Sequence, residues 1–185
     1  MDDEISIYKV VFVGESGTGA KTSLINRIVY NSFDPEQIST LSPQYVSKSF
    51  KNNLGNKIKL GIWDTAGQEK YRSLVKIFLK DSHCIILGYD ITHKRSFDQI
   101  REYHYNKVKE IVGDFPLIYL VANKIDLNKD KMVSENEASN FAKEKNIKFF
   151  QVSAKTGEGV DNLVKDIVNS ITDKFILKKE VKIKK

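Results

Sequence analysis

The sequence predicts an α/β fold in which a mostly parallel sheet is covered by helices on both faces. Short apolar runs alternate with longer amphipathic stretches along the chain, which is the pattern of strand–helix–strand units. The runs are nearly continuous, as expected for parallel strands that are buried on both faces. Ligands of such sheets bind beyond the carboxyl ends of the strands, so the loops that follow the strands are the expected place for chemistry.

The apolar runs and the amphipathic stretches predict the individual strands and helices. The apolar runs predict strands at Tyr8–Val13, Ile58–Trp63, Cys84–Tyr89, Leu117–Ala122 and Phe149–Val152. Apolar residues at helical spacing predict helices over residues 22–30, 95–111, 135–145 and 160–172. Ser134 stands three residues before Glu137, which is the spacing of a capping box at the start of the third helix.

Length and composition favour one compact domain in a reducing compartment. The chain has 185 residues, of which 41% are hydrophobic and 29% charged. It contains no window of about 18 uncharged apolar residues, so we expect no transmembrane span. The N-terminus begins with acidic residues, which is unlike a signal peptide. Cys84 is the single cysteine, which excludes an internal disulfide and fits a cytoplasmic protein.

The positive charge of the chain is concentrated at its C-terminal end. The net charge is +6, and residues 174–185 contain six lysines and one glutamate, leaving about +1 for the rest. A nucleic-acid-binding domain would carry a basic face on its folded body, so we expect no nucleic acid partner. The tail is either a solvated extension or a basic spacer attracted to an anionic membrane surface.

A glycine-rich loop follows the first predicted strand. In Gly14–Thr22 the backbone N–H groups can turn toward an anion, and the next helix adds the positive end of its dipole. Lys21 can reach terminal phosphates, and the Thr22 hydroxyl can bind Mg²⁺. The pattern indicates a Walker A loop, although a glycine-rich turn without a ligand has a similar composition. The predicted ligand contacts are Ser16, Gly17, Thr18, Gly19, Ala20, Lys21, Thr22 and Ser23.

The spacing of this loop is irregular. One residue too many separates Gly14 from Lys21, and Ala20 stands where the pattern has its second glycine. A left-handed backbone at an alanine costs about 1 kcal/mol or more. A one-residue bulge that leaves Lys21 and Thr22 in place would avoid that cost.

Several later segments resemble, in order, the motifs of the Ras superfamily, and within it those of the Rab family of membrane-traffic GTPases. The first is Trp63–Glu69, similar to the family's segment for magnesium and the γ-phosphate. The resemblance implies that Asp64 holds Mg²⁺ through a water, that the Gly67 N–H bonds the γ-phosphate and that Gln68 orients the attacking water as the catalytic residue. It also implies a three-layer P-loop G domain with a mostly parallel six-stranded sheet.

Two further segments resemble the family's guanine-binding motifs. Asn123-Lys124-Ile125-Asp126 follows a predicted strand, and a carboxylate at Asp126 can accept both the N1–H and the N2 amine of guanine. The stem of Lys124 would lie along the base. Ser153, Ala154 and Lys155 follow the last strand and resemble the second base loop, in which the Ala154 N–H would meet the guanine oxygen.

Two positions between the glycine-rich loop and Trp63 also match the family. Phe33 lies where the family stacks an aromatic ring on guanine, although a core phenylalanine is the alternative. Thr40 matches the threonine that reaches Mg²⁺ only when GTP is bound, so that hydrolysis releases two switch loops. Pro43 stands near the usual glycine of the family, and the chain ends in lysines without the prenylated cysteines of Rab proteins.

The resemblance also implies partners and a location. Tyr45, Trp63 and Phe78 align with the aromatic triad through which Rab proteins meet effectors, ordinary core packing being the alternative. An exchange factor and a GTPase-activating protein are expected, with a monomer on the cytosolic face of endomembranes. Tyr71–Leu74 looks most like the endosomal branch. The expected divisions are an N-terminal extension at 1–6, the G domain at 7–173 and a basic tail at 174–185.

The motifs together favour a Rab-like GTP-binding switch with Mg²⁺ and GTP or GDP as ligands. Hydrolysis without a partner should be slow, because no catalytic arginine is evident in the chain. An arginine supplied by a partner typically raises the hydrolysis rate by a factor of ~10³ to 10⁵. The irregular loop motivates an alternative, a pseudo-GTPase that serves as a binding module. An ATP-using kinase is disfavoured by Asp126. The three histidines have no metal-like spacing, and Cys84 is expected to be buried.

Overall fold

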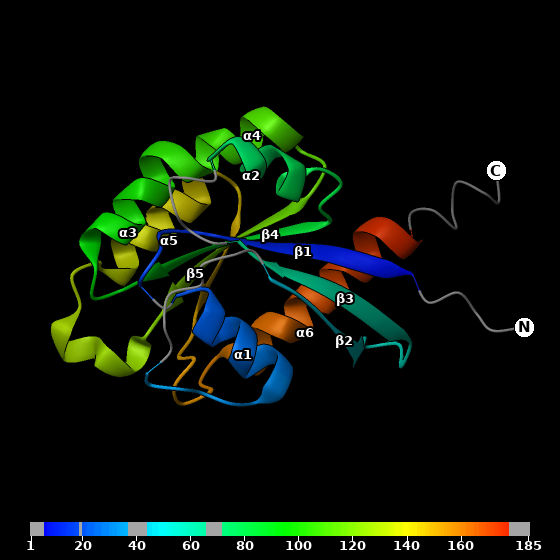
Figure 1. Ribbon diagram of the computed structural model, residues 1–185, viewed down its shortest axis with the longest axis horizontal. Helices are drawn as coiled ribbons and strands as arrows, with labels where there is room; N and C mark the ends of the chain where they lie inside the picture. Colours follow the sequence, from blue (N-terminus) through cyan, green and yellow to red (C-terminus); the bar gives the residue numbers. More distant parts are fainter. Residues whose placement is uncertain (1–5, 19, 37–43, 66–71, 178–185) are drawn as a thin grey trace, which may run out of the picture.

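A six-stranded sheet lies between two layers of helices in the computed structural model, which describes residues 6–18, 20–36, 44–65 and 72–177 (Figure 1). The strands are β1 Ile7–Val13, β2 Gln44–Lys51, β3 Lys57–Asp64, β4 Cys84–Asp90, β5 Leu117–Asn123 and β6 Lys148–Gln151. The predicted α/β fold with a mostly parallel six-stranded sheet is therefore confirmed.

The strand order is β2-β3-β1-β4-β5-β6, with β1 near the centre. Only the β2–β3 pair is antiparallel; β1 pairs in parallel with β3 and β4, as does β5 with β4 and β6. The five parallel strands consequently end at one edge of the sheet. This edge carries the loops that are predicted to bind ligand.

Helices cover both faces of the sheet. In Figure 1, α1 and α6 lie on one face, while α2, α3, α4 and α5 lie on the other. The α-helices are α1 Thr22–Tyr30, α2 Arg72–Leu79, α3 Lys94–Gln99, α4 Tyr105–Val112, α5 Glu135–Glu144 and α6 Val160–Ile171. Shorter helical turns are η2 Ile100–His104, η3 Ile125–Asp130 and η4 Thr172–Leu177. None of the described helices is long and apolar enough to cross a membrane.

Each face of the sheet has its own apolar core. One core joins alternate residues of β1 and β3 to α1 and α6, with Leu24 and Leu163 fully buried. The other joins β4 and β5 to the opposite helices and includes the fully buried Phe97. Apolar residues three and four positions apart form the buried stripe of α6. Ser134 caps α5 as predicted, since the Glu137 N–H donates to Ser134 Oγ at 3.1 Å, while the Glu137 carboxylate pairs with Lys94 at 2.7 Å.

The structure adds elements that the periodicity does not predict. The edge strand β2 is exposed or half-buried along its length, and its mixed polar sequence lacks the apolar run that marks the central strands. Helix α2 is also additional. The single helix predicted at 95–111 is α3 and α4 joined by the π-helical turn η2.

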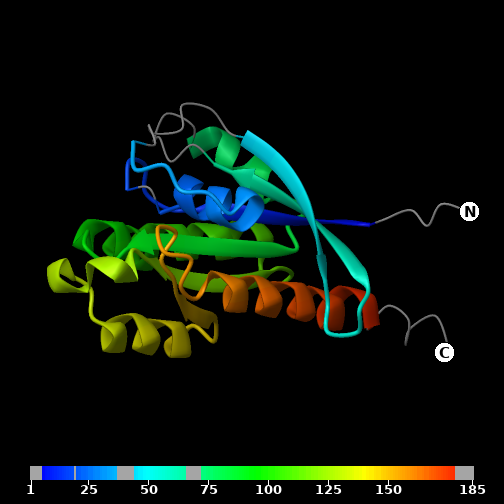
Figure 2. The ribbon, with the colours of Figure 1, turned by 90° about the horizontal axis from the view of Figure 1, so that it is seen from below.

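The C-terminal helix packs against the turn between β2 and β3, as Figure 2 shows. Asn52 Nδ2 donates to Thr172 Oγ1 at 3.2 Å, and the Asn53 N–H donates to Asn169 Oδ1 at 3.0 Å. The helical backbone continues through η4, where Phe175 is 8% exposed. Residues 174–177 of the predicted tail are thus in contact with the folded body.

Candidate functional site: a cavity at the carboxyl edge of the sheet

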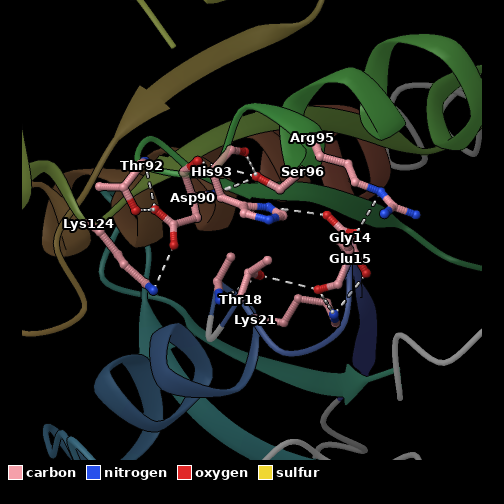
Figure 3. Close-up of polar contacts among 11 residues, drawn as sticks. Gly14, Glu15, Thr18, Lys21, Asp90, Thr92, His93, Arg95, Ser96 and Lys124 are labelled. Atoms are coloured by element: carbon pink, nitrogen blue, oxygen red, sulfur yellow. Dashed lines mark hydrogen bonds and ion pairs between the residues drawn. The ribbon is translucent and has the colours of Figure 1, made fainter. Parts of the chain in front are cut away.

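The glycine-rich loop turns tightly against the next parallel strand. A Cβ atom on Gly14 would lie 2.3 Å from the Gly88 carbonyl oxygen of β4, so only glycine fits there. Lys21 ends the loop and is 5% exposed. Its ammonium donates to the carbonyl oxygens of Gly14 at 2.8 Å and Glu15 at 3.0 Å (Figure 3). The loop therefore encircles a buried positive charge.

Burial lowers the pKa of the Lys21 ammonium, and the nearby carboxylates of Asp64 and Glu15 act in the opposite direction. The two carboxylates favour the charged form of Lys21, and the two carbonyl oxygens accept hydrogen bonds from it. Such a cation is suited to binding an anionic ligand.

The end of the irregular loop leads directly into α1. Ala20 is buried, and its carbonyl oxygen lies 3.4 Å from Asn123 Nδ2. The backbone of α1 begins at Thr22 directly after Lys21.

Two oxygen-bearing side chains converge beside the loop. Thr22 Oγ1 donates to Asp64 Oδ2 at 2.5 Å, and Asp64 is 3% exposed at the end of β3. A hydroxyl and a carboxylate are the hard oxygen ligands that Mg²⁺ prefers. The donor set of this pair therefore fits a magnesium ion.

A cavity of about 350 Å³ opens next to the loop. It is formed by the glycine-rich loop, the start of the segment after α1 and the two loops that follow β5 and β6. Nine of the residues predicted to contact ligand line it: Gly17, Thr18, Ser23, Phe33, Asn123, Lys124, Asp126, Ala154 and Lys155. Asp34, Pro35 and Leu127 complete the lining and were not predicted. Phe33 also packs against the α1–α6 core. Its ring therefore makes the contacts of a core phenylalanine and also lines the cavity.

Asn123 connects the three loops around this cavity. It is 1% exposed, and its Oδ1 accepts hydrogen bonds from the backbone N–H groups of Lys124 at 2.7 Å and Ala154 at 3.0 Å. Ser153 Oγ donates to Asp126 Oδ1 at 2.6 Å. The Ala154 N–H, predicted to meet a guanine oxygen, is therefore directed at Asn123 in this structure.

Sequence reasoning missed Asp90, the last residue of β4. Its carboxylate is 2.7 Å from Lys124 Nζ and accepts hydrogen bonds from the backbone N–H and the hydroxyl of Thr92 (Figure 3). Lys124 adopts a left-handed backbone with φ 68°. Asp90 thus fixes the direction of a lysine that lines the cavity. An acid directly after a buried apolar run was the available indication in the sequence.

Glu15 connects the glycine-rich loop to the start of α3 (Figure 3). Its carboxylate lies 3.4 Å from His93 Nδ1 and 3.4 Å from Arg95 Nε. Both partners are largely exposed, so these pairs contribute little to stability. His93, expected from the sequence to be an ordinary surface residue, is therefore close to the loop.

Away from the cavity, three predicted aromatic residues form one contiguous group. The ring centroid of Trp63 lies 5.0 Å from that of Tyr45 and 5.8 Å from that of Phe78. Tyr45 is 49% exposed, and the other two are half-buried. Trp63 and Phe78 also pack against the core on the α2–α5 face, so the accessible edge of the group is Tyr45.

Six predicted site residues are described away from the cavity lining: Ser16, Ala20, Lys21, Thr22, Asp64 and Ser153. They lie in the loops just described or, for Thr22 and Asp64, at the adjoining ends of α1 and β3. Gly19, Thr40, Gly67 and Gln68 lie outside the described residues. Cys84 is completely buried, as expected.

The strand order and the position of the glycine-rich loop after β1 define a P-loop GTPase domain. A sequence model of the Ras family matches residues 9–173. The chain is 35% identical over 168 residues to Ras-related protein Rab-1 of Theileria parva, covering 91% of this chain and 76% of that protein. It is 38% identical over 161 residues to human Ras-related protein Rab-21, covering 86% and 70% of the two chains.

A third relative, Ras-related protein Rab-21 of Geodia cydonium, is 39% identical over 165 residues, or 89% of this chain and 71% of that protein. The chain therefore belongs to the Rab family of Ras-related small GTPases. It is a Rab-like GTP-binding switch that hydrolyses GTP, of the kind that regulates vesicle traffic.

Proposed function

We propose that the cavity of about 350 Å³ is the site at which this switch binds GTP and GDP. The observation that carries the proposal is that three loops distant in sequence line one cavity with side chains suited to phosphate and guanine. Phe33 covers the base from one side, and the Lys124 stem lies along it. Asp126 accepts from the N1–H and N2 amine of guanine, since a carboxylate offers two acceptors to two neighbouring donors.

The phosphates are bound by the glycine-rich loop in this proposal. Backbone N–H groups from Ser16 to Thr22 and the start of α1 bind the α- and β-phosphates. The buried ammonium of Lys21 exchanges its carbonyl partners for phosphate oxygens. A bound Mg²⁺ would be held by Thr22, by Asp64 through a water and by Thr40 in the GTP state, and would neutralise charge on the β- and γ-phosphates.

Hydrolysis and switching depend on the segments next to this site. Gln68 orients the attacking water. The Gly67 N–H binds the γ-phosphate and Thr40 reaches Mg²⁺ only in the GTP state, so both contacts are lost when the cleaved phosphate leaves. The same loss releases the switch segments from effectors. A GTPase-activating protein supplies the missing arginine, and an exchange factor opens the site.

The accessible aromatic group of Tyr45, Trp63 and Phe78 is the proposed effector surface. It extends across β2 and β3 to α2, next to the segments expected to change with the nucleotide. The affinity of a partner that packs against these rings would depend on their relative positions. We further propose a monomer with a G domain at 7–173, positioned at the cytosolic face of endomembranes, the endosomal membrane included, with help from the basic tail.

The first experiment is to identify the nucleotide that accompanies the purified protein. The protein is purified without added nucleotide and denatured by heat, and the supernatant is analysed by ion-exchange chromatography. Near-stoichiometric GDP or GTP is the expected result. No nucleotide, together with failure to bind added GDP or GTP with Mg²⁺, would overturn the proposed site and favour the pseudo-GTPase module.

A variant that lacks Ala20 refines this test, because the deletion restores the regular spacing between Gly14 and Lys21. If only the deletion variant binds nucleotide, the extra loop residue prevents binding in the natural chain. Binding by the natural chain excludes that explanation.

A further inference from the structure

We infer that Arg27 is a positioning residue for the base loop, an inference that rests on the proposed function. Arg27 lies in the last turn of α1. Its Nε donates to the Ala154 carbonyl oxygen at 2.7 Å, and its Nη2 donates to the Lys155 carbonyl oxygen at 2.7 Å. These bonds connect residues 127 and 128 positions apart. The guanidinium thus holds two successive carbonyl groups of the loop that follows β6.

The third nitrogen of the same guanidinium fixes its direction. Nη1 donates to Asn31 O at 2.9 Å and to Asn31 Oδ1 at 3.0 Å. Asn31 ends α1 in a left-handed conformation with φ 53°. All three nitrogens of Arg27 therefore donate hydrogen bonds, which uses the rigid planar fork of arginine. A lysine presents one ammonium and cannot reproduce this arrangement.

Ala154 is held from both sides of its backbone. Its N–H donates to Asn123 Oδ1 at 3.0 Å, and its carbonyl oxygen accepts from Arg27. The loop also closes on itself, since the Gly157 N–H donates to the Ser153 carbonyl oxygen at 2.8 Å. Ala154 lines the cavity. In the proposed complex this N–H exchanges its Asn123 partner for the guanine O6, and its direction then depends on the anchor that Arg27 provides at the carbonyl group.

The same contacts connect the two halves of the proposed site. Helix α1 begins at Thr22, beside the phosphate loop, and carries Arg27 at its other end. A displacement of α1 that accompanies loss of phosphate would therefore be transmitted to the base loop through one side chain. Arg27 does not line the cavity, so its effect on the base is indirect.

The test compares three nucleotides in the natural protein and in Arg27→Gln. GDP offers O6 to the Ala154 N–H, 6-thio-GDP offers a sulfur, which is a weaker acceptor, and IDP lacks only the N2 amine that Asp126 would bind. We expect Arg27→Gln to release GDP about tenfold faster, because hydrogen bonds from a charged group are lost. Its preference for GDP over 6-thio-GDP should fall, while its preference for GDP over IDP should stay unchanged.

Arg101→Gln is the matched control, because Arg101 pairs only with surface carboxylates in the described structure. It should leave all three affinities as they are in the natural protein. Arg27→Lys should retain part of the GDP preference, and it replaces the glutamine variant in the same comparison if thermal unfolding shows that variant to be unfolded.

Three outcomes would overturn the inference. Affinities for all three nucleotides that fall by the same factor would assign Arg27 a structural role alone. Unchanged affinities would show that the loop does not need the anchor. A natural protein that binds no GDP would overturn the proposed function itself, which is distinct from a natural protein that binds GDP and is insensitive to Arg27.

Discussion

The Thr22 hydroxyl lies 2.5 Å from the Asp64 carboxylate, although 42 residues separate them in sequence. The parallel register of β1 and β3 explains this proximity. Phe12 pairs with Asp64, so β3 ends beside the place where β1 enters the glycine-rich loop. Thr22 then starts the helix that returns from that loop. The sheet thus brings together the two side chains that would hold Mg²⁺.

The first prediction concerns this pair. Thr22→Ala removes the hydroxyl and should weaken the magnesium-dependent part of nucleotide binding by about tenfold. Chelation of Mg²⁺ speeds GDP release from the natural protein if the ion contributes to binding. Release from the variant should already be fast and should respond little to a chelator. Release of a fluorescent GDP analogue measures both rates.

Ser139→Ala serves as the control, since the Ser139 hydroxyl donates to the Asn136 carbonyl oxygen within α5 and Ser139 does not line the cavity. An identical response of Thr22→Ala and the control to the chelator would contradict the role of Thr22.

The second prediction concerns Asp126 and the choice of base. Asp126→Asn loses the acceptor for the N2 amine and should weaken GDP binding by at least about 100-fold. Its amide can donate to the 2-oxo group of xanthine, so affinity for xanthosine diphosphate should rise. Competition binding with both nucleotides gives the ratio. Asp130→Asn in the same helical turn is the control, and unchanged GDP affinity in Asp126→Asn would exclude base recognition by this residue.

The third prediction concerns Asp90, which the sequence does not identify. Asp90→Asn replaces a buried carboxylate by an amide whose donor group faces the Lys124 ammonium. We expect the free energy of unfolding to fall by about 1–3 kcal/mol, and GDP release to become faster because Lys124 loses its fixed direction. Urea denaturation without nucleotide and release of labelled GDP measure the two effects separately.

Asp98→Asn is the matched control for Asp90. Asp98 also pairs with a lysine, Lys94, at 2.8 Å, but on a more exposed surface, so its replacement should cost at most about 1 kcal/mol. If the two variants have equal stability and equal GDP release, the buried pair of Asp90 and Lys124 has no special role.

The fourth prediction concerns hydrolysis. Gln68→Leu removes the amide proposed to orient the attacking water and should prolong the GTP state. Single-turnover hydrolysis of preloaded GTP measures the effect, and GTP affinity should stay close to that of the natural protein. Comparable rates of hydrolysis in the two proteins would count against Gln68 as the water-orienting group.

The central strands could be predicted from the sequence because they are apolar on both faces, as Cys84–Asp90 illustrates with every residue buried. Strand β2 could not, because an edge strand presents one face to solvent and mixes polar with apolar residues. Lys21, Asn123 and Asp126 could be predicted because their side-chain chemistry suits the ligand directly. Arg27 could not, since an arginine on the polar side of an amphipathic helix looks solvent-exposed until its carbonyl partners in a distant loop are known.

The last prediction concerns stability at alkaline pH. Burial raises the pKa of the Cys84 thiol and of the Tyr89 and Tyr119 hydroxyls, with smaller contributions from nearby carboxylates. The folded protein keeps these protons, whereas the unfolded chain releases them near their ordinary pKa values. Their contribution to stability is therefore complete below those values and is lost as pH rises above about 9. Each group adds a slope of up to about 1.4 kcal/mol per pH unit.

Cys84→Ala isolates the group that titrates first. Its free energy of unfolding should fall less steeply than that of the natural protein between about pH 8.5 and 10. Lysines that titrate in the same range, including Lys9 and Lys21 with pKa values lowered by burial, act in the opposite direction but are common to both proteins. The difference in slope therefore reports the thiol together with its effect on the pKa of Tyr119. Urea denaturation across this range measures it, and parallel curves for the two proteins would show that the buried thiol ionises as readily in the folded state as in the unfolded chain.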